Sequence, residues 1–200
     1  MQCSDLTCYA FCFYMYPFCL YHGMLYTYHR ISSPRALSVK INFVAIDFDQ
    51  TIIDIHTGGK WNGTAAELAT HVRPQFAHFL RAAAEASLHI AVVTFSPQVG
   101  YVSEVLRMHF PAFADRVVIR GRDGSWSYEG GGSRKGKQAF IASAVEELET
   151  KYTTDISKST AVLIDDDHYN VSYAIRDGMR AIWLEPAKPE TFFQKVLEMI

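Results

Sequence analysis

The chain has 200 residues, of which 49% are hydrophobic and 20% are charged. These proportions are typical of a globular domain and exclude wholesale disorder. The 19 basic and 21 acidic side chains give a net charge of −2 at pH 7. The chain therefore lacks the positive field that binds nucleic acid non-specifically, and no nucleic-acid partner is expected.

Residues 1–38 differ in composition from the rest, and we predict that they form an extension of a domain spanning residues 39–200. All four cysteines lie before residue 20, and the stretch from Leu6 to His29 contains six of the 11 tyrosines but no Asp, Glu, Lys or Arg. A helix of that length could cross a bilayer, but Pro17 and Gly23 interrupt it. A membrane anchor, a targeting peptide and a weakly ordered extension all remain open.

The position of the cysteines also bears on location. A disulfide framework would spread over the domain that it stabilises, whereas residues 20–200 contain no cysteine. We therefore predict a cytoplasmic protein, with anchoring through residues 6–29 as the alternative. Any contact with a membrane is expected through residues 1–38 alone.

From residue 41 onward, short apolar runs alternate with segments whose hydrophobic residues recur at helical spacing. The apolar runs predict five buried strands, at 41–47, 88–94, 116–120, 160–164 and 180–184. The other segments predict helices over 64–71, 74–86, 96–109, 137–150, 169–177 and 191–200, and a small β-hairpin over the glycine-rich residues 121–132. This alternation predicts an α/β fold with a doubly wound, Rossmann-like parallel sheet of about five strands.

Polar side chains that can carry chemistry follow four of these strands. In chain order they are Asp47, Asp49 and Thr51; Thr94 and Ser96; Lys135 or Lys137 at a helix start; and Asp165 and Asp166. Because ligands bind at the carboxyl ends of strands in such sheets, we expect these groups to converge. Converging carboxylates repel one another unless a cation or shared protons neutralise them, and oxygen ligands without a nearby thiol favour Mg²⁺. A Mg²⁺ ion beside a lysine predicts a phosphate site.

The order of these motifs resembles that of the haloacid dehalogenase (HAD) superfamily of phosphohydrolases, over roughly residues 42–186. The family pattern is a strand ending D-x-D-x-T, a strand ending in Thr or Ser, a lysine before a helix and a strand ending in an acidic pair. This sequence has AIDFDQT, VVTFS, GSRKGKQAF and VLIDDD. The segments VRPQFAHFL and IDDDHYN are further similar to the magnesium-dependent phosphatase branch, although Asp167 stands where that branch commonly has Glu.

The resemblance implies a Mg²⁺-dependent phosphomonoesterase that works through an aspartyl-phosphate. Asp47 would be the nucleophile, and Asp49 the general acid and then the base for water. Thr94 and a lysine would bind the transferring phosphoryl group. Lys137 matches better than Lys135, because the apolar helix face continues directly from it.

The resemblance also implies the metal ligands. Asp47 and the backbone carbonyl of Asp49 would contact the ion, and Asp166 would be a direct ligand. Asp165 would act through water or support the site from behind. We expect Asp167 to cap the following helix and Asn170 to orient the acidic loop.

This superfamily carries its cap domains in two intervals, which here run from Thr51 to Thr94 and from Thr94 to Lys137. Neither interval is long enough to hold an additional domain, so we predict no large cap and an open site. Such a site could admit a phosphorylated protein side chain or a small phosphorylated molecule. Besides Thr94 and Lys137, the candidates for binding phosphate or substrate are Thr51, Ser96 and Trp61, the last equally well explained as a packing anchor.

Two other functions fit the same motifs. A phosphotransferase or mutase would use the same chemistry, but the absence of a cap disfavours it, since transfer requires that water be excluded. A catalytically silent HAD-fold binding module, perhaps tethered to a membrane, belongs to a different class. Such modules typically lose one of the paired aspartates, whereas Asp47 and Asp49 are both present.

Overall fold

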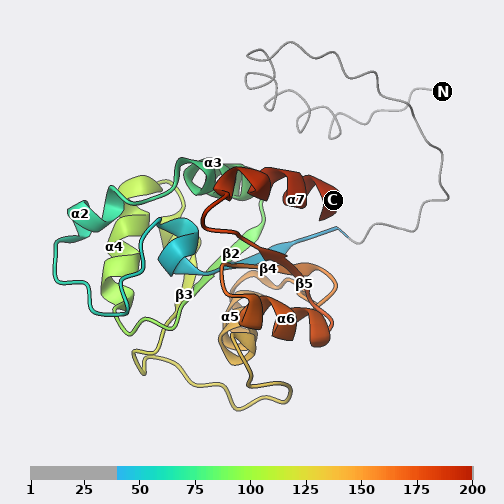
Figure 1. The fold of residues 1–200 in the computed structure, drawn as a ribbon. Helices are drawn as coiled ribbons and strands as arrows, with labels where there is room; N and C mark the ends of the chain where they lie inside the picture. The colour runs from blue at the N-terminus through green and yellow to red at the C-terminus, as the bar shows by residue number, and fades with distance from the viewer. Residues whose placement is uncertain (1–39, 200) are drawn as a thin grey trace, which may run out of the picture. The chain divides into compact units, whose positions relative to one another are not determined.

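The computed structural model describes residues 40–199, and within them a single sheet of five parallel strands in the order β3-β2-β1-β4-β5 (Figure 1). The strands are β1 (Phe43–Ile46), β2 (His89–Val93), β3 (Val118–Arg120), β4 (Ala161–Asp165) and β5 (Arg180–Trp183). All five predicted strands are present, each within its predicted range or one residue beyond it. The predicted doubly wound sheet is thus confirmed, while the prediction for residues 1–38 lies outside the described residues.

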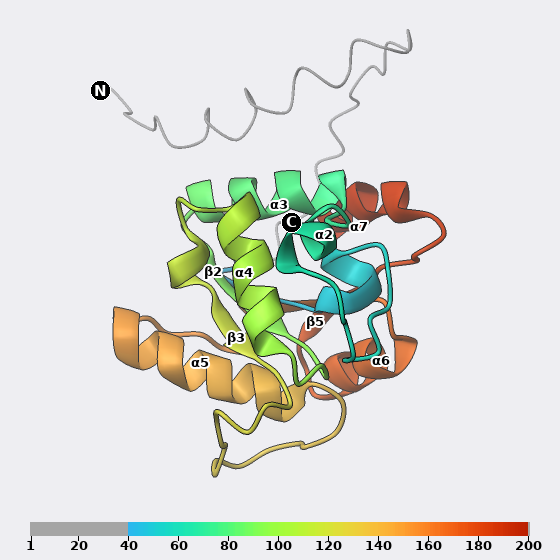
Figure 2. The same cartoon turned by 90° about the vertical axis from the view of Figure 1, so that its left-hand side faces the viewer.

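Helices cover both faces of the sheet. They are α2 (Ala65–Ala69), α3 (Pro74–Glu85), α4 (Val99–His109), α5 (Gln138–Tyr152), α6 (His168–Arg176) and α7 (Phe192–Met199). The helices α3, α4 and α7 lie on one face, and α5 and α6 lie on the other (Figures 1 and 2). None of the helices in the described part of the chain is long and apolar enough to cross a membrane.

The central strand shows why the sheet is buried on both sides. Alternate residues of β1 point to opposite faces, as the pleat of a strand requires. Val44 and Ile46 join the apolar cluster beneath α3 and α4, whereas Phe43 and Ala45 join the cluster beneath α5. Neighbouring strands pair with β1 on both edges, so its backbone groups are satisfied as well.

Local signals set the ends of the helices. Thr64 accepts a hydrogen bond from the Glu67 amide and the Glu67 carboxylate accepts one from the Thr64 amide, a capping box that starts α2. The helix α4 begins at Val99 rather than at the predicted Ser96. The Ser96 hydroxyl accepts a hydrogen bond from the Gln98 amide (3.1 Å), which holds these residues in a turn instead.

The predicted hairpin over 121–132 is wrong, because this segment contains no strand. Side chains bind its backbone instead of a partner strand. The Trp126 indole donates to the Gly121 carbonyl (2.7 Å), and Arg134 donates to the carbonyls of Tyr128 and Gly130. The segment is a long loop at the carboxyl end of β3, beside the ends of the strands that carry the predicted site.

The described residues hold no additional domain in either interval where a cap was considered. Between the predicted motifs lie α2 and α3 in the first interval, and α4, a short helical turn η3 (Ala114–Arg116), β3 and the 121–137 loop in the second. No additional domain of the described residues therefore covers the carboxyl end of the sheet.

Candidate active site

The carboxyl end of β1 delivers Asp47, and the chain then reverses in the turn η2 (Phe48–Ile52). Gln50 has a φ of 56°, in the left-handed region, which makes the reversal sharp. Its amide donates to the Ile55 carbonyl (2.9 Å), and its carbonyl accepts from buried Arg73 (3.3 Å). This turn places Asp47 and Asp49 in the lining of one cavity.

Lys137 lies directly against Asp47. Its ammonium donates to the Asp47 carboxylate and to the Val93 carbonyl (2.6 Å), and lies 3.3 Å from the Asp165 carboxylate. The side chain is 1% exposed, so it has been buried together with its counter-charges. Lys135 is instead placed over the Tyr173 ring, 5.4 Å from its centre. The structure therefore brings Lys137, and not Lys135, to the predicted nucleophile.

The two acidic residues at the end of β4 have different surroundings. Asp165 is fully buried and accepts hydrogen bonds from the Asp167 amide (2.9 Å) and from the Asn170 side chain (3.1 Å to each oxygen). Asp166 is partly exposed, and its carboxylate accepts one hydrogen bond, from the Thr51 hydroxyl (3.3 Å). Asn170 thus orients the acidic loop, as expected.

A metal ion would fit among these carboxylates. Asp47, Asp165 and Asp166 each offer an oxygen, and the three oxygens lie within 4.8 Å of one another. Such a set of hard oxygen donors, without a thiol or imidazole, suits Mg²⁺. Three clustered carboxylates beside one lysine also leave an excess of negative charge that a divalent cation would neutralise.

The electrostatics of the protein without a metal reflect this excess. Burial raises the pKa of Asp47 from 3.8 to about 8; Lys137 opposes the shift, and the charge of Asp165 adds to it. Burial alone would lower the pKa of Lys137, but the charges of Asp47 and Asp165 raise it. Burial and the charge of Asp165 likewise raise the pKa of Asp166. The site thus keeps its lysine charged and tends to hold a proton on a carboxyl group.

Asp49 is held apart from this cluster by the loop that follows η2. Its carboxylate accepts hydrogen bonds from the Thr57 amide (2.9 Å) and the Thr57 hydroxyl (2.7 Å), and lies 3.3 Å from a ring nitrogen of exposed His56. Two neighbouring aspartates on one turn therefore have distinct environments, one paired with a lysine and the other with hydroxyl and amide donors. Such a division is typical of a nucleophile and a proton-transfer group.

Thr94 and Ser96 complete the edge from β2. The Thr94 hydroxyl accepts a hydrogen bond from the Ser96 amide (3.1 Å), and both side chains are buried. They line a cavity of about 460 Å³, which also contains most of the other predicted site residues: Asp47, Asp49, Lys137, Asp165 and Asp166. Residues predicted from separate segments of the sequence thus share one cavity at the carboxyl end of the sheet.

Two predicted substrate-binding residues lie outside the lining of this cavity. Thr51 is fully buried and donates to Asp166. Trp61 packs edge-on against His71, and its indole donates to the Thr64 carbonyl (3.0 Å). These Trp61 contacts are those expected of a packing anchor, one of the two alternatives for this residue, and the Thr51 hydroxyl holds the Asp166 carboxylate.

The cavity also includes residues that the sequence motifs did not single out. Arg122 and Phe95 line it, with the guanidinium of Arg122 4.1 Å from the centre of the Phe95 ring. The position of Arg122 in the sequence does indicate a place in the site. The residue closely follows the end of β3, and the carboxyl ends of the parallel strands lie at the same edge of the sheet. The glycine-rich run 121–132 instead predicts a hairpin turn, which assigns no binding role to Arg122.

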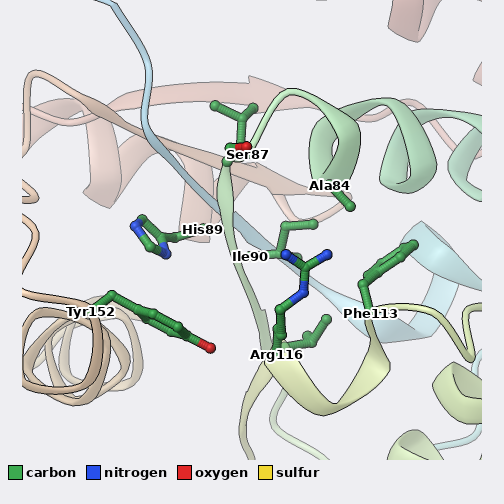
Figure 3. Close-up of a pocket in the computed structure, with 9 residues that line it drawn as sticks. Ala84, Ser87, His89, Ile90, Phe113, Arg116 and Tyr152 are labelled. Atoms are coloured by element: carbon green, nitrogen blue, oxygen red, sulfur yellow. The ribbon is translucent and has the colours of Figure 1, made fainter.

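A second cavity, of about 160 Å³, lies among residues at the opposite ends of β2 and β3 (Figure 3). Figure 3 shows His89 and Tyr152 on one side of it and Arg116 and Phe113 on the other. His89 begins β2, is partly buried and stacks on Tyr152, and its burial lowers its pKa. No carboxylate lines this cavity, so it lacks the donors of a metal-assisted site.

No protein-family model and no curated protein sequence matches the chain. Several solved structures, however, are similar to the chain. The N-terminal part of protein BF1531 from Bacteroides fragilis, described as containing a phosphatase domain complexed with Mg, has a TM-score of 0.53 at 14% identity over 80% of this chain and 40% of its own. An uncharacterized protein from Listeria monocytogenes serotype 4b has a TM-score of 0.52 at 16% identity over 72% of this chain and 79% of its own.

The HAD domain of the effector protein Lem4 from Legionella pneumophila has a TM-score of 0.41 at 15% identity, over 80% of this chain and 96% of its own. At these identities the likeness concerns the fold alone, and the two TM-scores above 0.5 support it. The sheet order, the turn after β1 and the acidic end of β4 match the motif order of the sequence. The described residues therefore have the doubly wound, Rossmann-like fold that the sequence predicts, and they share it with these two solved structures.

Proposed function

We propose that this protein is a Mg²⁺-dependent phosphomonoester hydrolase that works through an aspartyl-phosphate. The observation that carries the proposal is the pairing of buried Asp47 with Lys137 inside a cluster of three carboxylates, with Asp49 on the same turn. A phosphatase domain with the same fold, that of BF1531, is described as complexed with Mg. Phosphate esters need a nucleophile, an acid and positive charge around the phosphoryl oxygens, and the cavity offers residues for each role.

In the first half of the reaction, an oxygen of Asp47 attacks phosphorus and the bond from phosphorus to the ester oxygen breaks. Asp49 gives its proton to the departing oxygen, so the alcohol leaves neutral. Lys137 balances the charge of the phosphoryl oxygens and of Asp47, and the Thr94 hydroxyl donates to a phosphoryl oxygen. These assignments give Asp47, Asp49, Lys137 and Thr94 one role each.

In the second half, Asp49, now ionised, accepts a proton from a water molecule that attacks the phosphorus of the aspartyl-phosphate. The bond from phosphorus to the Asp47 oxygen breaks, which regenerates the carboxylate and releases inorganic phosphate. Thr57 keeps Asp49 in place in both steps through its amide and hydroxyl. Asp49 thus gives one proton to the alcohol and regains one from water.

Asp47 and Asp166 would hold the Mg²⁺ ion directly, with the backbone carbonyl of Asp49. When bound, the ion would supply positive charge to the phosphoryl oxygens. Asp165 supports the site from behind, because its oxygens are already engaged by Lys137, Asn170 and the Asp167 amide. The Thr51 hydroxyl orients Asp166.

The test is hydrolysis of p-nitrophenyl phosphate with and without Mg²⁺, for the parent and Asp47→Asn. Because an amide cannot attack phosphorus, we expect turnover to fall by more than about 10³-fold while the protein stays folded. The control is Asp115→Asn, since this aspartate is 85% exposed in a surface pair with Arg107. Acid quenching with labelled substrate should also trap label on the parent and not on Asp47→Asn. A folded Asp47→Asn protein within tenfold of the parent rate would disprove the assignment.

A further inference from the structure

We propose that Arg122 and the Phe95 ring form a second anion-binding subsite next to the phosphoryl site. The substrate is then a phosphomonoester with a second anionic group, a carboxylate or another phosphate. This inference rests on the proposed function for the phosphoryl half of the site. It adds a substrate class that neither the fold nor the catalytic motifs specify.

The first observation is the charge of Arg122 and its lack of a counter-ion. Among residues 40–199 the Arg122 guanidinium forms no ion pair, and its neighbour Asp123 is engaged by Ser125. Lys137, the other cation of the cavity, is neutralised by Asp47 and Asp165. Arg122 is therefore the cation in this cavity that remains available to bind a ligand. Its planar guanidinium can donate two parallel hydrogen bonds to a carboxylate or a phosphate.

The second observation is that the guanidinium is held in place. It lies over the Phe95 ring at 4.1 Å, and Phe95 contacts Phe140 edge-on, with ring centres 5.4 Å apart. Phe140 in turn contacts Trp126 at 4.7 Å. An arginine stacked on a supported ring loses less conformational freedom on binding an anion than a free surface arginine does.

The third observation is that the backbone of Arg122 is fixed as well. Its amide donates to the Ser96 carbonyl (3.0 Å), and Trp126 binds the carbonyl of the preceding Gly121 (2.7 Å). Gly121 permits this approach, because a Cβ there would lie 2.6 Å from the Ser96 carbonyl oxygen. The loop after β3 is thus attached to the loop after β2, which carries Thr94.

The two cations lie close to one ring, at most about 9 Å from each other, which is within reach of a small substrate. The Lys137 ammonium lies 4.9 Å from the centre of the Phe95 ring and the Arg122 guanidinium lies 4.1 Å from it, so one ring adjoins both cations. A phosphorus and a carboxyl carbon joined by four bonds of about 1.5 Å can reach both. The cavity of about 460 Å³ lies within the range of small-molecule sites.

The experiment uses the full chain and two matched pairs of substrates. 3-Phosphoglycerate differs from glycerol 3-phosphate by a carboxylate, and fructose 1,6-bisphosphate differs from fructose 6-phosphate by a second phosphate. In at least one pair we expect the parent to prefer the member with the second anionic group by about 10- to 100-fold in kcat/KM. The pair that shows the preference tells whether the second group is a carboxylate or a phosphate. In Arg122→Gln that ratio should fall towards 1, and in Arg122→Lys it should be intermediate, because lysine keeps the charge without the fork.

The control is Arg107→Gln, which removes the same charge from the last turn of α4, where Arg107 is 62% exposed; its ratios should equal those of the parent. Calorimetric titration of the same four compounds in EDTA, where the proposed Mg²⁺-dependent turnover is stopped, measures binding at the subsite. If the parent hydrolyses none of them but binds the member with two anionic groups more tightly through Arg122, the proposed function fails and the subsite stands. Equal affinities and rates within both pairs, or a preference that survives Arg122→Gln, would overturn the subsite.

Discussion

At the scale of single residues, the carboxylates of the site differ in how many partners each already has. Asp165 is fully buried with donors on both oxygens, whereas Asp166 is partly exposed and has one. A carboxylate whose lone pairs are used by the protein is a poor direct ligand, and one with free lone pairs is a good one. The acidic pair therefore divides into a supporting member and a binding member.

We predict that Asp166→Ala raises the Mg²⁺ concentration needed for half-maximal activity by more than tenfold with little loss of stability. Asp165→Ala should instead lower stability by about 2–4 kcal/mol, because buried donors on Asn170 and Asp167 lose their acceptor. Titrating activity against Mg²⁺, with thermal melts of both proteins, tests the difference. The variant Asp165→Asn preserves part of the hydrogen bonding and keeps the comparison interpretable. The reverse ranking would exchange the two roles.

The raised pKa of Asp47 predicts a pH dependence of stability. Burial raises this pKa from 3.8 to about 8, so the folded protein binds more protons than the unfolded chain between those values. The resulting stabilisation is complete below about pH 4 and is lost as the pH rises towards 8. In EDTA, the melting temperature of the parent should therefore fall between about pH 5 and pH 8.5 more steeply than that of Asp47→Asn. Identical slopes for the two proteins would contradict the prediction.

Single residues could be predicted from the sequence where a motif fixes their spacing. They could not be predicted where their position depends on contacts with residues that are distant in the sequence. Asp47 directly follows β1 and Asp165 ends β4, so the parallel sheet brings these two together. Lys135 and Lys137 are close together in the sequence, but the Lys137 ammonium is buried and the Lys135 ammonium lies over the Tyr173 ring. Choosing between them required the apolar face of the following helix to be located. Arg122 belongs to no motif, and the role proposed for it depends on the Phe95 ring, which is distant in the sequence.

At the scale of elements, the strands were predictable and the loop after β3 was not. Buried strands show as apolar runs whichever face each residue meets, which is why β1, β2 and β4 stand out. The loop 121–137 contains the glycines of a hairpin, but its backbone is bound by Trp126 and Arg134 instead. Such side-chain-to-backbone contacts have no periodic signature in a sequence.

The attachment of this loop leads to a prediction at Gly121. A Cβ there would lie 2.4 Å from Val99 and 2.6 Å from the Ser96 carbonyl oxygen, so Gly121→Ala must push the two loops apart. We expect a loss of about 1–3 kcal/mol in unfolding free energy and a weaker preference for substrates with a second anionic group. Gly131→Ala is the control in the same loop, since its Cβ would meet nothing within 4 Å. Equal melting temperatures for the two variants would show that the close approach is unimportant.

At the scale of the whole molecule, the described residues contribute two apolar clusters, one on each face of the sheet. Within the described part of the chain, the members of these clusters lie between Ile41 and Val196. The central strand is paired on both edges, and the site is assembled from residues 47–170. Every component that the proposed chemistry uses is thus supplied by the predicted domain 39–200.

We therefore predict that a chain of residues 39–200 keeps the phosphatase activity of the full chain within about twofold, because its core and site stay complete. Thermal melts and p-nitrophenyl phosphate hydrolysis of the two chains, side by side, test this.

Removing the stretch 6–29, which has no Asp, Glu, Lys or Arg, should also reduce aggregation. If residues 6–29 are an anchor, the full chain alone will sediment with membranes and detergent will release it. A shorter chain that melts early and loses activity would mean that residues 1–38 contribute to the core, and that the domain boundary is misplaced.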